Sequence, residues 1–151
     1  MNEEKKKSLS AKKYLEQLQI IDEKITQNLE ELELMKLKAC SLPGMDYSRE
    51  RVQTTSSGDG LGNTVVRYTA RSQEIDQEID QLAQAKDKIR RQIQGLNEKN
   101  YMQVLFKIYV QYKSIKIAAA EMEKSYSYVV ALHKRALEEF EKVYQDLYYL
   151  T

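Results

Sequence analysis

Apolar residues recur at alternating steps of three and four along two long segments of the chain. The first repeat runs through Ala11, Tyr14, Leu18, Ile21, Ile25, Asn28, Leu32, Met35, Ala39 and Leu42. The second runs through Leu61, Val65, Tyr68, Ser72, Ile75, Ile79, Leu82, Lys86, Ile89, Ile93 and Leu96. Spacing of this kind, sustained over several heptads, is typical of helices that pack in a coiled coil. The pattern therefore predicts two long α-helices with apolar seams.

The connection between these segments is rich in residues that end helices. The only proline, Pro43, and four of the five glycines lie between residues 43 and 62. Such a stretch predicts one long loop, and two long helices joined by one loop fold most simply into an antiparallel hairpin. We predict a coiled-coil hairpin over residues 10–96 with a flexible loop over 43–62, preceded by a charged, disordered arm over 1–9.

The predicted seams are neither complete nor sufficient to bury every apolar residue. Three polar residues interrupt them: Asn28, Ser72 and Lys86. Polar residues at seam positions fix register or oligomeric state at some cost in stability. Three leucines lie beside the first seam: Leu15, Leu29 and Leu34. We therefore expect the hairpin to pack against a second copy, which makes the chain a homo-oligomer.

The remaining residues, 97–151, contain neither glycine nor proline, yet their pattern divides into three helices. Asn97 is a candidate N-cap for the first helix, which has an apolar face formed by Tyr101, Leu105, Ile108 and Tyr112. Ser114 is placed to cap a short helix over 115–122, and Ser125 to cap a longer one. The longer helix places four apolar residues on one side: Val129, Leu132, Ala136 and Phe140.

The apolar stripe of the last helix continues through Phe140, Val143, Leu147 and Leu150, which predicts an extended C-terminal helix. A short helix, a tight turn and a longer helix, supported by a preceding helix, form a helix-turn-helix. The predicted fold is therefore all-α, with a long antiparallel helical hairpin followed by a three-helix domain.

The charge distribution changes the picture more than the net charge of +1. Residues 97–137 contain seven Lys or Arg against three Glu, whereas residues 138–151 contain one Lys against three Glu and one Asp. A locally basic stretch is typical of a phosphate-binding surface, although a solvated helical face with scattered lysines explains it equally well. The single cysteine, Cys40, excludes an internal disulfide framework. With no leader-like or membrane-spanning segment in the sequence, we expect a cytoplasmic protein without membrane contact.

The segment from Ser114 to Phe140 resembles the C-terminal DNA-binding region of sigma factors. Ser114 and Ser125 stand at the two helix caps of that region, and the motif Lys-Arg-Ala-Leu at 134–137 ends its recognition helix. Where sigma-like modules have glycine in the turn, this chain has Glu123. A residue with a side chain in left-handed conformation costs about 1 kcal/mol or more.

Most of the chain is similar to phage late transcriptional regulators of the ArpU/RinA type. The similarity rests on Arg-Glu-Arg-Val-Gln-Thr at 49–54, Ser-Gly-Asp at 57–59, Glu-Ile-Asp-Gln-Glu-Ile-Asp-Gln-Leu at 74–82 and Tyr-Ser-Tyr-Val-Val at 126–130. The resemblance implies a regulator that activates phage late genes, for packaging or lysis, in the cytoplasm of a bacterial host. It also implies host RNA polymerase as a possible partner.

Double-stranded DNA is the partner that a helix-turn-helix predicts, because residues near the N-terminus of its second helix contact base edges while flanking cations bind phosphates. The candidate base-reading residues are Tyr126, Ser127, Val130 and Ala131. The candidate phosphate contacts are Lys113, Lys116, Lys124, Lys134 and Arg135. The alternatives are that Tyr126 and Tyr128 pack against a neighbouring helix, and that Arg135 pairs with Glu121, Glu138 or Glu139.

The sequence offers little for catalysis, so we expect neither an enzyme nor a cofactor. The only histidine, His133, is six residues from Ser127 and therefore on another helical face. Cys40 lies on a seam-like face and is interpreted as a small packing residue, and the carboxylates of the 74–82 run are interpreted as a solvated stripe. Two alternatives to a transcriptional regulator remain: a coiled-coil adaptor that binds protein, and a DNA-binding component of phage packaging.

Overall fold

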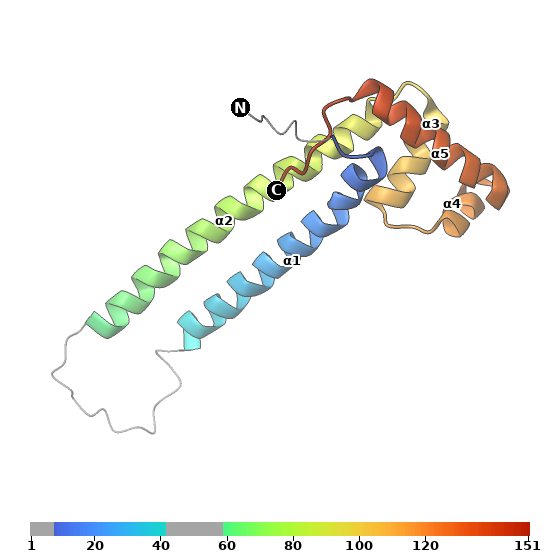
Figure 1. The fold of residues 1–151 in the computed structure, drawn as a ribbon. Coiled ribbons are helices and arrows are strands. Elements are labelled where there is room, and N and C mark those ends of the chain that lie inside the picture. Colours follow the sequence, from blue (N-terminus) through green and yellow to red (C-terminus); the bar gives the residue numbers. More distant parts are fainter. Residues whose placement is uncertain (1–7, 42–58) are drawn as a thin grey trace, which may run out of the picture. The chain divides into compact units, whose positions relative to one another are not determined.

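The computed structural model of the chain describes residues 8–41 and 59–151, with side chains for 8–40 and 66–151. The chain divides into two compact units. The first unit combines residues 1–23 with 83–151, and the second unit comprises residues 24–82. All regular structure in the described residues is helical, with no strand among them (Figure 1). The predicted all-α class is confirmed.

Two long helices, α1 (Ala11–Ser41) and α2 (Asp59–Gln94), contribute to both units. Every predicted seam position with a described side chain is buried or half-buried. In the second unit the seam combines buried Ile75 and Leu82 with half-buried Ile25, Leu32 and Met35. The alternating pattern was therefore a reliable indicator of which face of each helix is covered, because steps of three and four keep side chains on one side of a helix.

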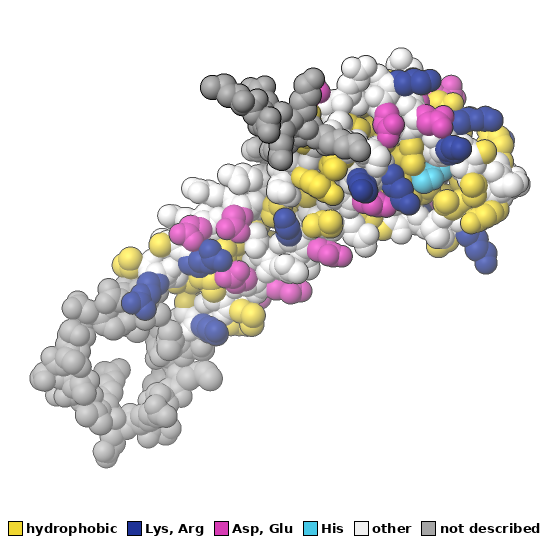
Figure 2. Space-filling view, viewed as in Figure 1, with side chains coloured by type: hydrophobic (Ala, Val, Ile, Leu, Met, Phe, Trp, Pro, Cys, Tyr) yellow, Lys and Arg dark blue, Asp and Glu magenta, His cyan; other side chains and the backbone are white. Residues whose placement is uncertain are grey.

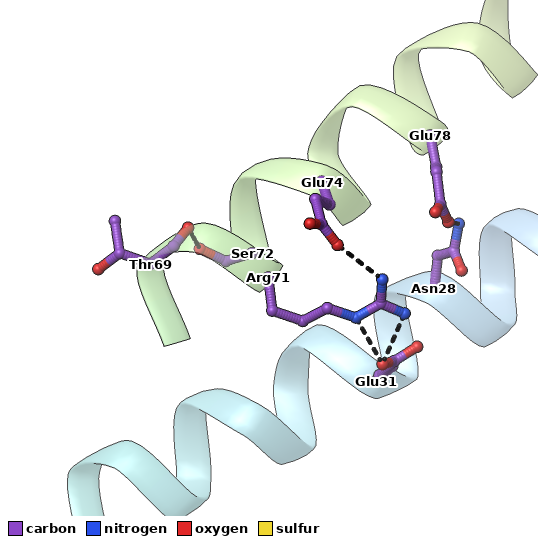
Figure 3. Close-up of polar contacts among 7 residues, drawn as sticks. All are labelled: Asn28, Glu31, Thr69, Arg71, Ser72, Glu74 and Glu78. Atoms are coloured by element: carbon purple, nitrogen blue, oxygen red, sulfur yellow. Dashed lines mark hydrogen bonds and ion pairs between the residues drawn. The ribbon is translucent and has the colours of Figure 1, made fainter. Parts of the chain in front are cut away.

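Polar contacts of the second unit show the relative direction of α1 and α2 (Figure 3). The Asn28 side-chain amide donates to Glu78 Oε2 at 3.2 Å. Arg71 contacts Glu31 at 3.2 Å and Glu74 at 3.0 Å, so its guanidinium lies between a carboxylate of each helix. Position 28 pairs with 78 and position 31 with 71, so the two segments are antiparallel in this unit. Asn28, a predicted interruption of the seam, thus has a polar partner.

The opposite ends of the same helices pack within the first unit. Tyr14 is buried there, and its hydroxyl donates to Gln92 Oε1 at 2.5 Å. Lys86, another predicted interruption of the seam, lies 2.6 Å from Asp22. The pairs 14–92 and 22–86 again run in opposite directions. The predicted boundary between a hairpin over 10–96 and a domain over 97–151 differs from this grouping, because these ends of α1 and α2 share the first unit with the C-terminal helices.

Helix α3 (Lys99–Leu105) continues directly into a π-helical turn, η1 (Phe106–Val110). Its N-cap is Glu98, without a side-chain cap bond, so the predicted cap Asn97 was one residue early. The Gln111 N–H donates to the Phe106 carbonyl at 3.0 Å, five residues back. This wider turn accommodates one additional residue. The core position therefore moves from the predicted Ile108, which is half-buried, to Tyr109.

Helices α4 (Ile115–Met122) and α5 (Tyr126–Val143) begin where the sequence predicted. Ser114 accepts from the Ile117 N–H and Ser125 from the Tyr128 N–H, each at 3.2 Å. These bonds satisfy N–H groups that have no partner inside the first turn of a helix. The buried face of α5 consists of the four predicted residues, Val129, Leu132, Ala136 and Phe140. It packs against α3 and α4 (Figure 1).

The predicted extension of the last helix to residue 150 is wrong. Helix α5 ends at Val143, Tyr144 is extended with φ −121° and ψ 106°, and residues 144–151 are not helical. Their backbone bonds elsewhere: the Leu147 carbonyl accepts from the Leu9 N–H at 2.7 Å, and the Leu150 N–H donates to Gln17 Oε1 at 2.9 Å. These tertiary partners replace the bonds that a helix would provide internally.

The same contacts correct the predicted arm over 1–9. Ser8 and Leu9 are bonded to the C-terminal segment, with the Leu147 N–H donating to the Ser8 hydroxyl at 3.2 Å. Residues 1–7 lie outside the described residues. The N-terminal and C-terminal segments of the first unit therefore hold each other in place beside α1.

The last four residues of the predicted loop over 43–62 are helical, because α2 begins at Asp59. Gly60 and Gly62 are helical, which is possible because glycine weakens a helix by only about 1 kcal/mol relative to alanine. Residues 42–58, with the Arg-Glu-Arg-Val-Gln-Thr motif, lie outside the described residues. Cys40 is exposed rather than packed, because it lies beside the seam and not in it.

Candidate nucleic-acid interface

Helix α5 presents a continuous exposed face opposite its buried one. Ser127, Val130, Ala131 and Lys134 are all exposed, and their spacing of three, four and seven residues places them on one side of the helix. Tyr126, at the first position of α5, is 60% exposed. Hydrophobic side chains gather over the end of the first unit that carries α4 and α5, with Lys and Arg around them (Figure 2). All four predicted base-reading residues thus lie on the surface of the chain.

The two tyrosines had an alternative interpretation as packing residues. Tyr128 is exposed like Tyr126, and the Lys124 ammonium lies 5.6 Å from the centre of its ring. A cation at this distance from an aromatic face is attracted by the ring quadrupole. Neither ring is buried against a neighbouring helix, so the packing alternative is wrong for both.

The turn between α4 and α5 has the geometry that usually requires glycine. Glu123 has φ 56° and ψ 40°, which is left-handed. The Glu123 N–H donates to the Ala120 carbonyl at 3.2 Å and the Lys124 N–H to the Ala119 carbonyl at 3.0 Å. Satisfying these terminal carbonyls of α4 is the usual function of a left-handed residue at a helix end. The turn therefore forms without glycine, at a conformational cost.

Replacing Glu123 with glycine is expected to stabilise the chain by about 1 kcal/mol, because glycine adopts left-handed conformation without steric strain. Urea unfolding followed by circular dichroism measures the change. Ala120→Gly is the matched control, since it places glycine inside α4 and should destabilise by about 0.5–1 kcal/mol. If both variants changed the free energy of unfolding in the same direction, the assigned turn geometry would be contradicted.

The predicted phosphate contacts divide into two groups. Lys116, Lys134 and Arg135 are exposed and form no ion pair with any residue in 8–40 or 66–151. Lys124 is exposed above Tyr128. In particular, Arg135 pairs with none of the glutamates considered from sequence. Four cations are thus available to an anionic ligand.

Lys113 belongs to the other group, because it is already paired. Its ammonium lies 2.6 Å from Glu121 Oε1, and the Lys107 ammonium lies 2.9 Å from Glu121 Oε2. Hydrogen bonds from Lys113 and then Lys107 hold the pKa of the Glu121 carboxyl below its usual value. A lysine that bridges to an internal carboxylate is a weaker phosphate contact than a free one. Sequence spacing gave no signal for this cluster, which joins η1 and α4.

A contact that sequence reasoning missed lies behind the exposed face. The Tyr109 hydroxyl and His133 Nε2 are 2.7 Å apart, and the two rings are stacked with centroids 5.6 Å apart. Burial, and then Glu16, raises the pKa of Tyr109, so the phenol keeps its proton and donates. Burial, and then Lys12, lowers the pKa of His133 from its ordinary 6.5. His133 therefore accepts the bond as a neutral imidazole, and this bond ties α5 to η1.

Acidification is expected to weaken the fold through His133. Because its folded pKa lies below 6.5, the unfolded chain binds the proton more readily. The stabilisation by neutral His133 is complete above pH 6.5 and decreases as the pH falls below that value. Below the folded pKa of His133 no further stabilisation is lost. Urea unfolding at pH 7.5 and 5.5 should show a larger loss for the natural chain than for His133→Gln, in which the carboxylates still titrate. Equal losses would contradict this role.

Comparisons with known proteins add no constraint, since no family model, no curated protein and no solved structure gives a significant match to the chain. None of the described helices combines the length and the apolar character needed to cross a bilayer. Within the part of the chain that the structure describes, no three His, Cys, Asp or Glu side chains are grouped so that they could hold a metal ion. The exposed α5 face with its cations is therefore the best-supported candidate site.

Proposed function

We propose that this chain is a sequence-specific DNA-binding transcriptional regulator that inserts the N-terminal half of α5 into the major groove of duplex DNA. The observation that carries the proposal is the exposed face of Tyr126, Ser127, Val130 and Ala131, flanked by cations that form no ion pair with a residue the structure describes. A helix held at its N-terminal end by a tight turn after a shorter helix is the usual way to present base-reading side chains.

Electrostatics support this orientation. Residues 113–137 contain five Lys or Arg against Glu121 and Glu123, and two lysines already neutralise Glu121. Cations without an acidic partner bind phosphates with release of counterions, so affinity falls steeply with salt. The acidic residues of α5 lie in its C-terminal half, where Glu141 Oε1 accepts from the Ala11 N–H at 2.8 Å. That carboxylate therefore caps the N-terminus of α1, and its contact is with another part of the first unit.

The biological setting follows from the resemblance to phage late regulators. The proposed regulator acts in the cytoplasm of a bacterial host, activates late genes for packaging or lysis, and does so through host RNA polymerase. Regulators with a recognition helix commonly bind paired half-sites as dimers, so a homo-oligomer fits this function. A packaging component that recognises a start site on phage DNA would use the same α5 surface.

A protein-binding adaptor is the second candidate, and one observation in the second unit favours it. Several large apolar side chains of α1 and α2 are exposed there: Leu29, Leu34, Leu37 and Val66. Exposed apolar residues in number are typical of surfaces that bind protein. The adaptor predicts that DNA affinity is weak and independent of α5.

Fluorescence anisotropy with labelled duplexes from the intergenic DNA of the source genome tests the proposal. Lys134→Glu with Arg135→Glu should weaken binding by about 100-fold or more and reduce the slope of log affinity against log salt by about 2. Lys24→Glu with Lys36→Glu is the matched control, since both are exposed lysines of the second unit and the net charge changes equally. Equal weakening by both pairs, or salt-insensitive binding, would favour the adaptor.

A further inference from the structure

The exposed face of α5 has a chemistry that restricts which bases it can recognise. The first turns of α5 expose Tyr126, Ser127, Tyr128, Val130 and Ala131, and four of these are the predicted base-reading residues. None of them is Arg, Lys, Asn, Gln, Asp or Glu. Specific contacts with guanine rely on Arg or Lys, those with adenine on Asn or Gln, and those with cytosine on Asp or Glu. The first turns of this face therefore lack the side chains that make the strongest contacts with three of the four bases, and the cations Lys134 and Arg135 follow only later along α5.

One group in the major groove remains well suited to this face. The C5-methyl of thymine is apolar, and it is recognised by alanine and other apolar side chains. Val130 is 40% exposed, and Ala131 beside it is exposed too, so both have methyl groups at the surface. Ser127 lies one turn earlier on the same face, where its hydroxyl can donate to thymine O4 or to adenine N7. The apolar and hydroxyl groups thus complement A·T pairs.

We infer that α5 selects its DNA through thymine methyl groups that contact Val130 and Ala131, which makes an A·T-rich sequence its recognition element. This inference rests on the proposed function of α5 as a recognition helix. From Ser127 to Ala131 the helix rises about 6 Å, which corresponds to about two base-pair steps of 3.4 Å. The contacted element therefore spans about three neighbouring base pairs.

The charges around this face fit a duplex rather than an apolar protein surface. Lys116, Lys124, Lys134 and Arg135 are exposed in the same part of the first unit, and none forms an ion pair with a described residue. Glu121 is held by two lysines, and Glu123, the other acid of residues 113–137, has no ion pair among the described residues. Cations at the border and methyl groups at the centre match phosphates beside a thymine-lined groove.

The test begins with duplexes selected by the full chain from a randomised pool. Thymines at the selected positions are then replaced singly by deoxyuridine, which removes only the methyl group. Each replacement at a contacted position should weaken binding about fourfold, the effect of one buried methyl group. Replacements in the flanking sequence should have no effect. Val130→Ala should bind the thymine duplex more weakly and lose most of the difference between thymine and deoxyuridine at one position.

The outcomes separate the two proposals. A G·C-rich selected sequence, or binding that is unchanged by deoxyuridine at every position, overturns the thymine inference while DNA binding stands. Failure to select any duplex, together with no difference between the chain and Lys134→Glu with Arg135→Glu, overturns the proposed function and the inference with it. Thermal unfolding of Val130→Ala controls for folding, and little change is expected because Val130 is on the exposed face of α5.

Discussion

Replacing Phe140 with alanine is expected to lower the free energy of unfolding of the first unit by about 3–5 kcal/mol, the usual cost of removing a buried aromatic ring. Phe140 is fully buried near the end of α5. Its ring centroid lies 5.9 Å from that of Tyr14 in α1 and 4.8 Å from that of Tyr144. Alanine would leave a cavity where α5, α1 and the C-terminal segment meet.

Urea unfolding monitored by circular dichroism measures this loss. Val143→Ala, three residues further along α5, is the matched control because Val143 is 49% exposed, and it should cost less than about 0.5 kcal/mol. Phe140→Leu keeps much of the volume and should lie between the two variants. If Phe140→Ala were as stable as Val143→Ala, the packing assigned to this end of α5 would be wrong.

The parts of the fold that the sequence predicted correctly depend on signals within a few residues. Ser114 and Ser125 each bond an N–H three residues later, so the cap and its partner are neighbours in sequence. The buried face of α5 follows from helical spacing alone. Such features depend little on the rest of the chain, and for that reason α4 and α5 begin where they were predicted to begin.

The features that were missed depend on partners distant in sequence. The π-turn at Phe106–Val110 moves Tyr109 into the core. There its hydroxyl contacts the ring of His133, which lies 24 residues further along the sequence. No periodicity in the sequence indicates that this turn contains an additional residue. Likewise, the apolar spacing of the last residues suits a helix, and only the backbone bonds to Leu9 and Gln17 explain the extended form. At the C-terminus, tertiary hydrogen bonds outweigh local propensity.

The candidate site, like the fold, was predictable from the sequence where it depends on helical spacing and not where it depends on tertiary contacts. Exposure of Tyr126, Ser127, Val130 and Ala131 follows from the spacing of the buried residues on the opposite face. The role of Lys113 does not, because its partner Glu121 lies across the junction of η1 and α4. Which lysines are free for an external anion is thus a property of the tertiary structure, whereas which helix face is free can be read from the sequence.

Replacing Leu147 with alanine is expected to cost about 2–5 kcal/mol, the range for a buried leucine. Leu147 is 1% exposed although it lies outside any helix. The backbone on both of its sides is fixed, because its N–H donates to Ser8 and its carbonyl accepts from Leu9. The side chain is therefore held in place by a pairing of the N-terminal and C-terminal segments, and a smaller residue cannot easily shift to fill the space.

This prediction also discriminates between the extended segment and the helical extension that the sequence favoured. A helical stripe of Val143, Leu147 and Leu150 would make the alanine variants of Val143 and Leu147 similarly costly. The extended segment instead buries Leu147 and leaves Val143 largely exposed, so only Leu147→Ala should lower the unfolding free energy strongly. Tyr149→Ala is a further control, since Tyr149 is exposed in the same segment. Similar losses of unfolding free energy for Val143→Ala and Leu147→Ala would contradict the extended segment. They would support the helical extension instead, because both side chains would then have to face one core.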